Sequence, residues 1–239
     1  MTEPVLFEVE KKTAIITLNR PERRNAINQA LLAGLYDAIE KVTNDKGIQV
    51  AIITGNGKSF CSGLDLAVVF EENLLDPRGD GRDLPDIVSA CKKPIIGAIN
   101  GHAITGGFEI ALNCDFLIAS EHAKFADTHA QVGIHPGWGM TQLLQQAVGR
   151  RRARQMSFTC KFIDAATALA WGLVNEVVPA DQLLPRAKEI ATDICAVNND
   201  MLGTVKELID YRDTTTHEKS YAHEREDFKV FAKKSLPGG

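Results

Sequence analysis

The stretch KPIIGAINGHAITGGFEIALNCDFLIAS, residues 93–120, contains a strand, a glycine-rich turn, a helix and a second strand in succession. Residues 94–101 (PIIGAING) and 115–120 (DFLIAS) are short, nearly continuous apolar runs, which are typical of buried strands. A short helix is expected to begin at Gly106. Two buried strands joined through a helix predict a crossover connection, which is characteristic of an α/β fold.

The sequence before this stretch predicts the same kind of unit. Residues 6–11 (LFEVEK) and 13–20 (TAIITLNR) predict two strands, the second ending before Pro21. Asn28 is the expected N-cap of a helix that continues to about Val42, with apolar side chains at helical spacing. Residues 50–55 (VAIITG) predict another buried strand, stopped by a glycine. The order strand, strand, helix therefore recurs along the chain.

The character of the sequence changes near residue 183, where charged side chains begin to alternate with apolar ones at helical spacing. We therefore expect a core over residues 1–182 and a helical C-terminal region over residues 183–239. A chain of 239 residues fits one large domain with an appendage better than two equal halves. The segment GDGR, residues 79–82, predicts a mobile loop tip.

The composition excludes several classes of protein. The formal net charge of −4 argues against nucleic acid as the main partner, because phosphate binding needs a basic excess. Five widely spaced cysteines form neither a CxxC pair nor a disulfide framework, and reduced thiols are expected. Neither a targeting segment nor an apolar run of membrane-spanning length is visible, so a cytoplasmic location is the expectation.

Two glycine-containing segments could carry chemistry. They are GNGKSFCSGLDL (residues 55–66) and NGHAITGGFEIALNCD (residues 100–115). Gly106 and Gly107 at a helix start leave backbone N–H groups that can bind a negative oxygen, and Gly63–Leu64 could supply a second N–H. Two such groups converging on one point would form an oxyanion hole. The alternative is that these glycines only permit turns with positive φ.

The motifs together resemble the crotonase (enoyl-CoA hydratase/isomerase) family over residues 5–183. The segments that carry the resemblance are NRPERRNAIN (19–28), GKSFCSGLDL (57–66), the stretch 93–116, GIHPGWGMTQLL (133–144) and AATALAWGLVNEVVP (165–179). The resemblance implies a spiral of ββα units and a C-terminal helical region used for homotrimer or dimer-of-trimers contacts. It also implies an acyl-CoA or enoyl-CoA thioester as the bound molecule.

The resemblance assigns roles by position. The oxyanion N–H groups fall on Leu64 and Gly106. The positions expected to meet the CoA moiety and the substrate are Ala26, Gly63, Leu64, Asp65, Leu66, Gly106 and Trp138. Trp138 stands where many relatives have a small residue and could shorten the acyl pocket, or it could simply be a packed tryptophan.

Glu109 and His129 are the predicted catalytic side chains. Glu109 follows Gly106 by three residues, so on a helix both face a similar direction. The resemblance aligns Glu109 with the first catalytic glutamate of hydratases; an acid that complements the helix dipole is the alternative. At the position of the second glutamate stands His129, which can exchange a proton near neutral pH and which Asp127 could orient if the segment is extended. A hydrogen-bonded histidine in the pocket wall is the alternative.

Other residues receive weaker predictions. The run Arg150–Arg152 with Arg154 indicates a solvated helix face, with contacts to CoA phosphates or to another subunit as the alternatives. Cys61 lacks the arrangement that a thiol nucleophile needs. His102 is expected in a structural loop. No metal-ligand spacing, GxGxxG or Walker pattern occurs, and no cofactor is expected because CoA would be part of the substrate.

The sequence therefore predicts an enzyme of fatty acid metabolism, a lyase that hydrates 2-enoyl-CoA thioesters through a thioester enolate. Because His129 replaces a glutamate, two alternatives stay open. One is an acyl-CoA-binding protein without catalysis. The other is isomerisation, thioester hydrolysis or decarboxylation on the same oxyanion hole.

Overall fold

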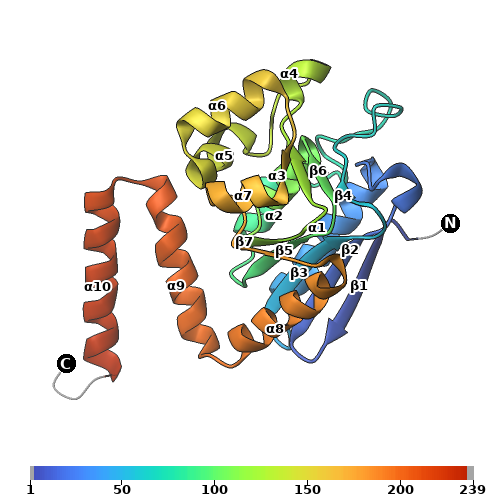
Figure 1. Cartoon of the computed structure of the whole chain (residues 1–239). Helices are drawn as coiled ribbons and strands as arrows, with labels where there is room; N and C mark the ends of the chain where they lie inside the picture. Colours follow the sequence, from blue (N-terminus) through green and yellow to red (C-terminus); the bar gives the residue numbers. More distant parts are fainter. Residues whose placement is uncertain (1–2, 236–239) are drawn as a thin grey trace. The chain divides into compact units, whose positions relative to one another are not determined.

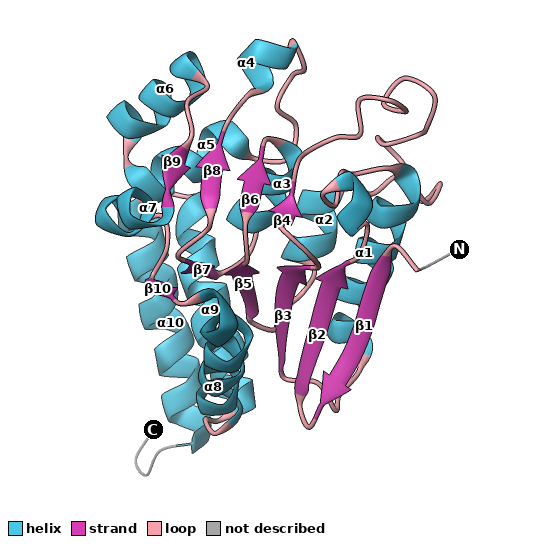
Figure 2. Cartoon of the chain, turned by 45° about the vertical axis from the view of Figure 1, so that its right-hand side comes forward, coloured by secondary structure: helices cyan, strands magenta, loops and turns pink. Residues whose placement is uncertain are grey.

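Two β-sheets organise the computed structural model, which describes residues 3–235 of the chain (Figures 1 and 2). The larger sheet contains, in spatial order, β1 (Val5–Glu10), β2 (Thr13–Leu18), β3 (Val50–Gly55), β5 (Ile95–Ile99), β7 (Phe116–Ser120) and β10 (Glu176–Val178). The smaller sheet contains β4 (Ser59–Cys61), β6 (His102–Ile104), β8 (Lys124–Ala126) and β9 (Ile163–Asp164). All pairs are parallel except β1 with β2 and β8 with β9.

The chain visits the two sheets in turn. It passes from β3 to β4, from β5 to β6 and from β7 to β8, and each pass adds one strand to each sheet. A helix ends each pass: α2 (Leu84–Ser89), α3 (Gly106–Leu112) and α4 (His129–Val132). Figure 2 shows the smaller sheet as a second row of strands above the larger one. The predicted α/β class and the spiral of ββα units are confirmed.

Polar side chains join successive passes where the chain turns from one sheet into the other. The Asn100 side chain accepts a hydrogen bond from the Gly55 N–H at 3.1 Å and donates one to the Gly57 carbonyl at 2.9 Å. The Ser120 hydroxyl donates to the Asn100 carbonyl at 3.0 Å. At these turns the backbone N–H and C=O groups cannot pair with a neighbouring strand, and the side chains provide their hydrogen bonds instead. The bonds also connect each pass to the next one.

The larger sheet is buried on both faces, as its continuous apolar runs predict. Alternate residues of β3 point to opposite sides: Ala51 and Ile53 pack in the main core, which includes helix α1 (Gln29–Asn44), and Val50 and Ile52 pack in a second cluster. The predicted N-cap is confirmed, since the Asn28 side chain accepts a hydrogen bond from the Leu31 N–H.

Helix α8 (Leu183–Cys195) covers the second face of the sheet. Its residues Leu183, Ala187 and Ala191 are buried against the β3, β5 and β7 side chains of that cluster. The chain divides into two compact units after Ala196, so α8, the first helix of the predicted C-terminal region, belongs to the first unit. The periodicity of α8 was visible in the sequence, but the surface it packs on was not.

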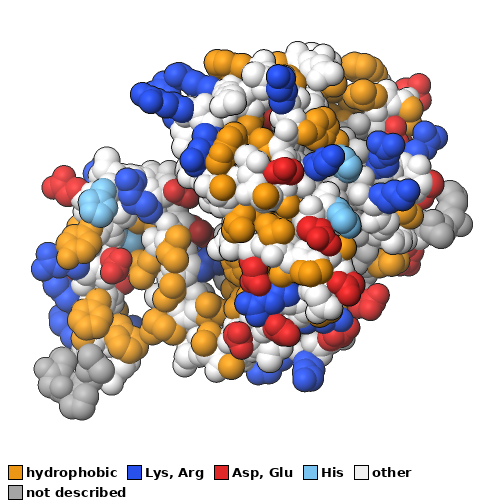
Figure 3. Space-filling model, viewed as in Figure 1, with side chains coloured by type: hydrophobic (Ala, Val, Ile, Leu, Met, Phe, Trp, Pro, Cys, Tyr) orange, Lys and Arg blue, Asp and Glu red, His pale blue; other side chains and the backbone are white. Residues whose placement is uncertain are grey.

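The other helices of the first unit are η1 (Pro21–Arg23), α5 (Met140–Val148), α6 (Arg150–Thr159), α7 (Ala165–Trp171) and η2 (Ala180–Gln182). The second unit contains α9 (Asn199–Tyr211), η3 (Arg212–Thr214) and α10 (His217–Ser235). Neither α9 nor α10 has a buried residue, and hydrophobic side chains run along both in Figure 3. Residues 236–239 of the predicted helical region lie outside the described residues. Among the helices described, none combines the length and the apolar character needed to cross a membrane.

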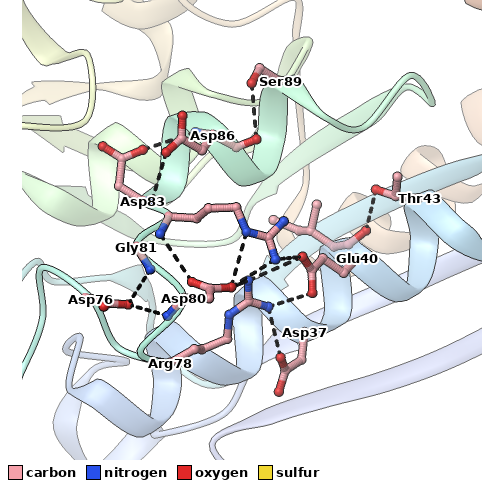
Figure 4. Close-up of polar contacts among 12 residues, drawn as sticks. Asp37, Glu40, Thr43, Asp76, Arg78, Asp80, Gly81, Asp83, Asp86 and Ser89 are labelled. Carbon is pink, nitrogen blue, oxygen red and sulfur yellow. Dashed lines mark hydrogen bonds and ion pairs between the residues drawn. The ribbon is translucent and has the colours of Figure 1, made fainter.

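The loop between β4 and α2 contains the predicted mobile tip, and ion pairs attach it to α1 (Figure 4). The Arg78 guanidinium contacts Asp37 at 3.1 Å, Glu40 at 2.7 Å and Asp80 at 2.5 Å. Arg82 contacts Glu40 and Asp80 as well. The hydrogen bond from Arg78 holds the pKa of Glu40 below its usual value. A network of this kind holds a loop more effectively than isolated surface pairs do.

Gly107 provides a test of how tightly the passes pack. A Cβ on this residue would lie 2.3 Å from the Cys61 carbonyl oxygen of β4, which is backbone and cannot rotate away. Gly107→Ala is therefore expected to lower the free energy of unfolding by about 2 kcal/mol or more. In Gly137→Ala, by contrast, the new Cβ meets nothing within 4 Å. Thermal unfolding of both variants checks this expectation, and equal melting temperatures would contradict it.

Candidate active site

The first turn of α3 and the segment after β4 lie side by side. A Cβ on Gly63 would be 3.7 Å from the Gly106 nitrogen and 3.0 Å from the Ile104 carbonyl oxygen. Gly63 has φ +90°, a conformation that favours glycine. Within residues 3–235, neither the Leu64 nor the Gly106 N–H donates a hydrogen bond to the protein. The two segments that carry the predicted N–H donors therefore lie next to each other.

A second set of bonds ties the segment after β4 to residues 20–27. The Ile27 N–H donates to the Gly63 carbonyl and the Asp65 N–H donates to the Ile27 carbonyl, both at 2.8 Å. Arg20 donates to the Ala26 carbonyl at 2.5 Å and to the Asp65 carboxylate at 3.1 Å. These contacts bring Ala26, Gly63, Leu64 and Asp65 together. Leu66 follows directly and is 59% exposed.

Glu109 is buried on α3 and is held by backbone donors. Its Oε1 accepts hydrogen bonds from the Trp138 N–H at 2.9 Å and the Met140 N–H at 3.1 Å. The Asn113 side chain donates to the Trp138 carbonyl at 2.8 Å and fixes the same segment. A buried carboxylate needs such partners. One oxygen is thereby anchored, and Oε2 faces His129.

His129 lies at the start of α4 between two carboxylates. Its Nε2 is 3.6 Å from Glu109 Oε2, and its Nδ1 is 2.7 Å from Asp127 Oδ1. All three side chains are more than nine-tenths buried. Burial lowers the pKa of His129, but the hydrogen bonds and negative charges of Asp127 and Glu109 outweigh burial and raise it to about 9. The imidazole is therefore protonated at neutral pH.

Trp138 closes the site on one side. Its ring atom Cζ3 is 3.4 Å from the position that a Cβ on Gly106 would take, with Ile27 Cδ1 at 3.3 Å and Leu64 Cδ2 at 3.7 Å from the same point. Trp138 is partly buried. Three apolar side chains thus surround the start of α3, beside the Glu109 carboxylate. An apolar wall next to a few oriented polar groups is typical of a small-molecule site.

Comparison with known proteins decides the family. The enoyl-CoA hydratase/isomerase family model matches residues 8–236. The chain belongs to this family. Among its relatives is a protein of Arabidopsis thaliana named probable enoyl-CoA hydratase 1, peroxisomal, which is 42% identical over 231 residues, covering 91% of this chain and 86% of that protein.

Other enoyl-CoA hydratase/isomerase family members are comparably similar. The crotonyl-CoA hydratase of Syntrophomonas wolfei is 40% identical over 193 residues, covering 79% of this chain and 74% of that protein. The crystal structure of an enoyl-CoA hydratase from Mycobacterium avium superposes with a TM-score of 0.81 at 40% identity. It covers 97% of this chain and 100% of the other. These similarities confirm the resemblance identified from the sequence motifs.

The structure also shows the surroundings of three other residues weighed from the sequence, Cys61, His102 and Arg152. Cys61 is buried in β4, and burial raises the pKa of its thiol to about 12, so it is a poor nucleophile. The His102 ring packs edge-on against Phe162, and Arg152 packs over the Trp171 ring. In the described part of the chain, no three His, Cys, Asp or Glu side chains are arranged to hold a metal ion.

Asp127 contacts His129 in a way that the sequence did not specify. The expected condition was an extended segment, but Asp127 immediately precedes the turn that begins α4. From there its Oδ1 accepts both the His129 backbone N–H at 3.2 Å and the ring Nδ1–H at 2.7 Å. The sequence also did not predict that backbone N–H groups bind Glu109, because every residue except proline has such a group and residue types therefore do not reveal it.

Proposed function

We propose that the chain is an enoyl-CoA hydratase, which adds water across the double bond of a 2-enoyl-CoA thioester. The observation that carries the proposal is the buried pair of Glu109 and His129, whose Oε2 and Nε2 atoms are 3.6 Å apart. On the same helix as Glu109 and on the segment beside it, the N–H groups of Gly106 and Leu64 donate no hydrogen bond within the described residues. Family membership and relatives named as hydratases support the same reaction.

The reaction assigns one task to each group. The thioester carbonyl oxygen accepts hydrogen bonds from the Leu64 and Gly106 N–H groups, which stabilise the negative charge of the enolate. Glu109 takes one proton from the attacking water, whose oxygen bonds to the substrate β-carbon. The His129 Nε2–H supplies the proton that the α-carbon gains.

Binding of the thioester involves the residues gathered around that carbonyl. Ala26, Gly63, Asp65 and Leu66 are proposed to contact the CoA portion, and Trp138 is proposed to line the acyl pocket. The juxtaposition of the two backbone segments through Arg20 and Ile27 supports this arrangement. No separate cofactor enters the proposed reaction, since CoA is part of the substrate.

Substitution of the two catalytic side chains tests the proposal. Glu109→Gln and His129→Gln keep the side-chain volume nearly constant but remove the proton transfers. Each is expected to reduce kcat for crotonyl-CoA hydration roughly 10²–10⁴-fold, the usual size of general acid–base assistance. The exposed Glu121→Gln is the matched control and should retain full activity. Loss of the enoyl thioester absorbance measures the rate.

The outcomes separate the alternatives. A wild-type protein that binds CoA thioesters, as shown by thermal stabilisation, yet hydrates none of them would be a binding protein or would catalyse another reaction. A His129→Gln variant as active as wild type, with Glu109→Gln inactive, would reduce His129 to a residue of the pocket wall.

Assembly into a trimer or a dimer of trimers is a further part of the proposal. The second unit is a pair of helices with exposed apolar side chains, among them Ile209 on α9, 66% exposed, and Phe228 on α10, 60% exposed. Apolar surface of this extent marks contact sites in soluble proteins. Covering it with another copy of the chain would give a closed symmetric assembly.

Sedimentation velocity at micromolar concentration tests the assembly. The wild-type protein is expected to sediment as a trimer or a hexamer. Ile209→Asn should shift the distribution toward smaller species, since it places an amide on the apolar face, while Asp200→Asn in the exposed first turn of α9 should not. A wild-type protein that sediments only as a monomer would contradict the proposal.

The metabolic and cellular setting stays a prediction. A role in fatty acid metabolism follows from the proposed reaction. The cytoplasmic location predicted from the sequence is untested, and the Arabidopsis relative is named as a peroxisomal protein. Imaging of the tagged full-length chain in its own host would test the location.

A further inference from the structure

The Asp127 carboxylate has no task in the reaction as described, although it is 3% exposed and lies next to His129. Its Oδ1 accepts two hydrogen bonds from one residue, the ring Nδ1–H at 2.7 Å and the backbone N–H at 3.2 Å. Ser157, on α6, also lowers the pKa of this carboxylate. These bonds hold the pKa of Asp127 below its usual value against the opposing effect of burial. Asp127 is thus a fixed negative charge in the core.

We propose that Asp127 is the positioning residue of the hydratase site, and that the Asp127–His129 ion pair takes the place of a neutral carboxylic acid as the proton donor. This inference rests on the proposed hydratase function. The geometry supports it because the His129 Nδ1–H is hydrogen-bonded to Asp127. Only the Nε2–H is then left to face Glu109 and the substrate.

The charges of the three groups explain why the pair is needed. Asp127 and Glu109 are both buried, and a neutral imidazole between them would leave two carboxylates without a cation. A protonated His129 compensates one of them, and the site carries a net charge of −1. Two carboxylates that share one proton carry the same net charge. Replacing a glutamate by histidine is therefore neutral in charge only if an aspartate accompanies it.

The proton balance closes with these three side chains. The Nε2–H proton goes to the substrate α-carbon, the water oxygen bonds to the β-carbon, and a water proton goes to Glu109. Glu109 is then neutral, and His129 keeps its Nδ1–H bond to Asp127. Transfer of the proton from Glu109 Oε2 to His129 Nε2, now 3.6 Å apart, restores the starting state. One water molecule is consumed, and no other proton donor is required.

The pH dependence follows from the charges that face His129, which are Asp127 and Glu109. The donor is active when protonated, so activity is present below its pKa and is lost as the pH rises through about 9. Asp127→Asn removes one negative charge and lowers the pKa of His129. The alkaline limit of kcat should therefore move to lower pH, and the deficit relative to wild type should shrink as the pH falls toward 6.

The effect of Asp127→Asn in the wild-type protein and in the His129→Glu variant distinguishes this role from a merely structural one. His129→Glu alone places three carboxylates together, whereas His129→Glu combined with Asp127→Asn restores a net charge of −1 with one shared proton. We therefore expect Asp127→Asn to lower kcat for crotonyl-CoA hydration at least tenfold at pH 7.5 in the wild-type background. In the His129→Glu background the same change should raise kcat. Asp164→Asn, at the exposed N-cap of α7, retains a capping side chain. It is the matched control and should leave both rates and the pH limit unchanged.

Each result bears on the inference. A sign reversal between the two backgrounds, with KM changed less than about threefold in Asp127→Asn, supports it. An equal loss in both backgrounds, or a pH limit that does not move, overturns it while the hydratase function stands. If Asp127→Asn is insoluble in the wild-type background, a soluble double variant less active than His129→Glu still overturns it. A wild-type protein inactive on every enoyl-CoA overturns the proposed function and this inference together.

Discussion

Glu109 is a carboxylate in the centre of the core, 2% exposed, and its environment must compensate its charge. Two backbone N–H groups at residues 138 and 140 bind one oxygen, and His129 faces the other. Removing either kind of partner would leave a buried anion uncompensated, which costs several kcal/mol. The loop at residues 136–139, the start of α4 and the position of α3 are all constrained by this one side chain.

The spiral fold is what allows so many segments to converge there. α3 and α4 begin directly after β6 and β8, which are neighbouring parallel strands, so the starts of the two helices come close although they are distant in sequence. The Thr105 and Thr128 hydroxyls, at the N-caps of these helices, are 2.5 Å apart. Gly107 permits α3 to approach β4 closely enough for the Leu64 and Gly106 segments to meet. The groups proposed to act in catalysis therefore come from three passes, and the packing of these passes positions them.

Much of this arrangement could be predicted from residue types and order. Buried strands ending in glycine, the Asn28 cap and the periodicity of the helices are local signals, and the structure confirms them. The packing of α8 on the sheet was not visible in the sequence, because its periodicity is that of any amphipathic helix and only the sheet surface shows what it covers. The Asp127–His129 contact depended on a turn whose geometry no local pattern specified.

The central claim is that His129 is an imidazolium held between two carboxylates, and nuclear magnetic resonance of the protein with ¹⁵N-labelled histidine tests it directly. Comparison with His129→Gln assigns its ring signals. The account predicts that both ring nitrogens stay protonated through neutral pH and that the ring loses a proton near pH 9. Loss of the proton near pH ~6.5, the ordinary histidine value, would contradict it.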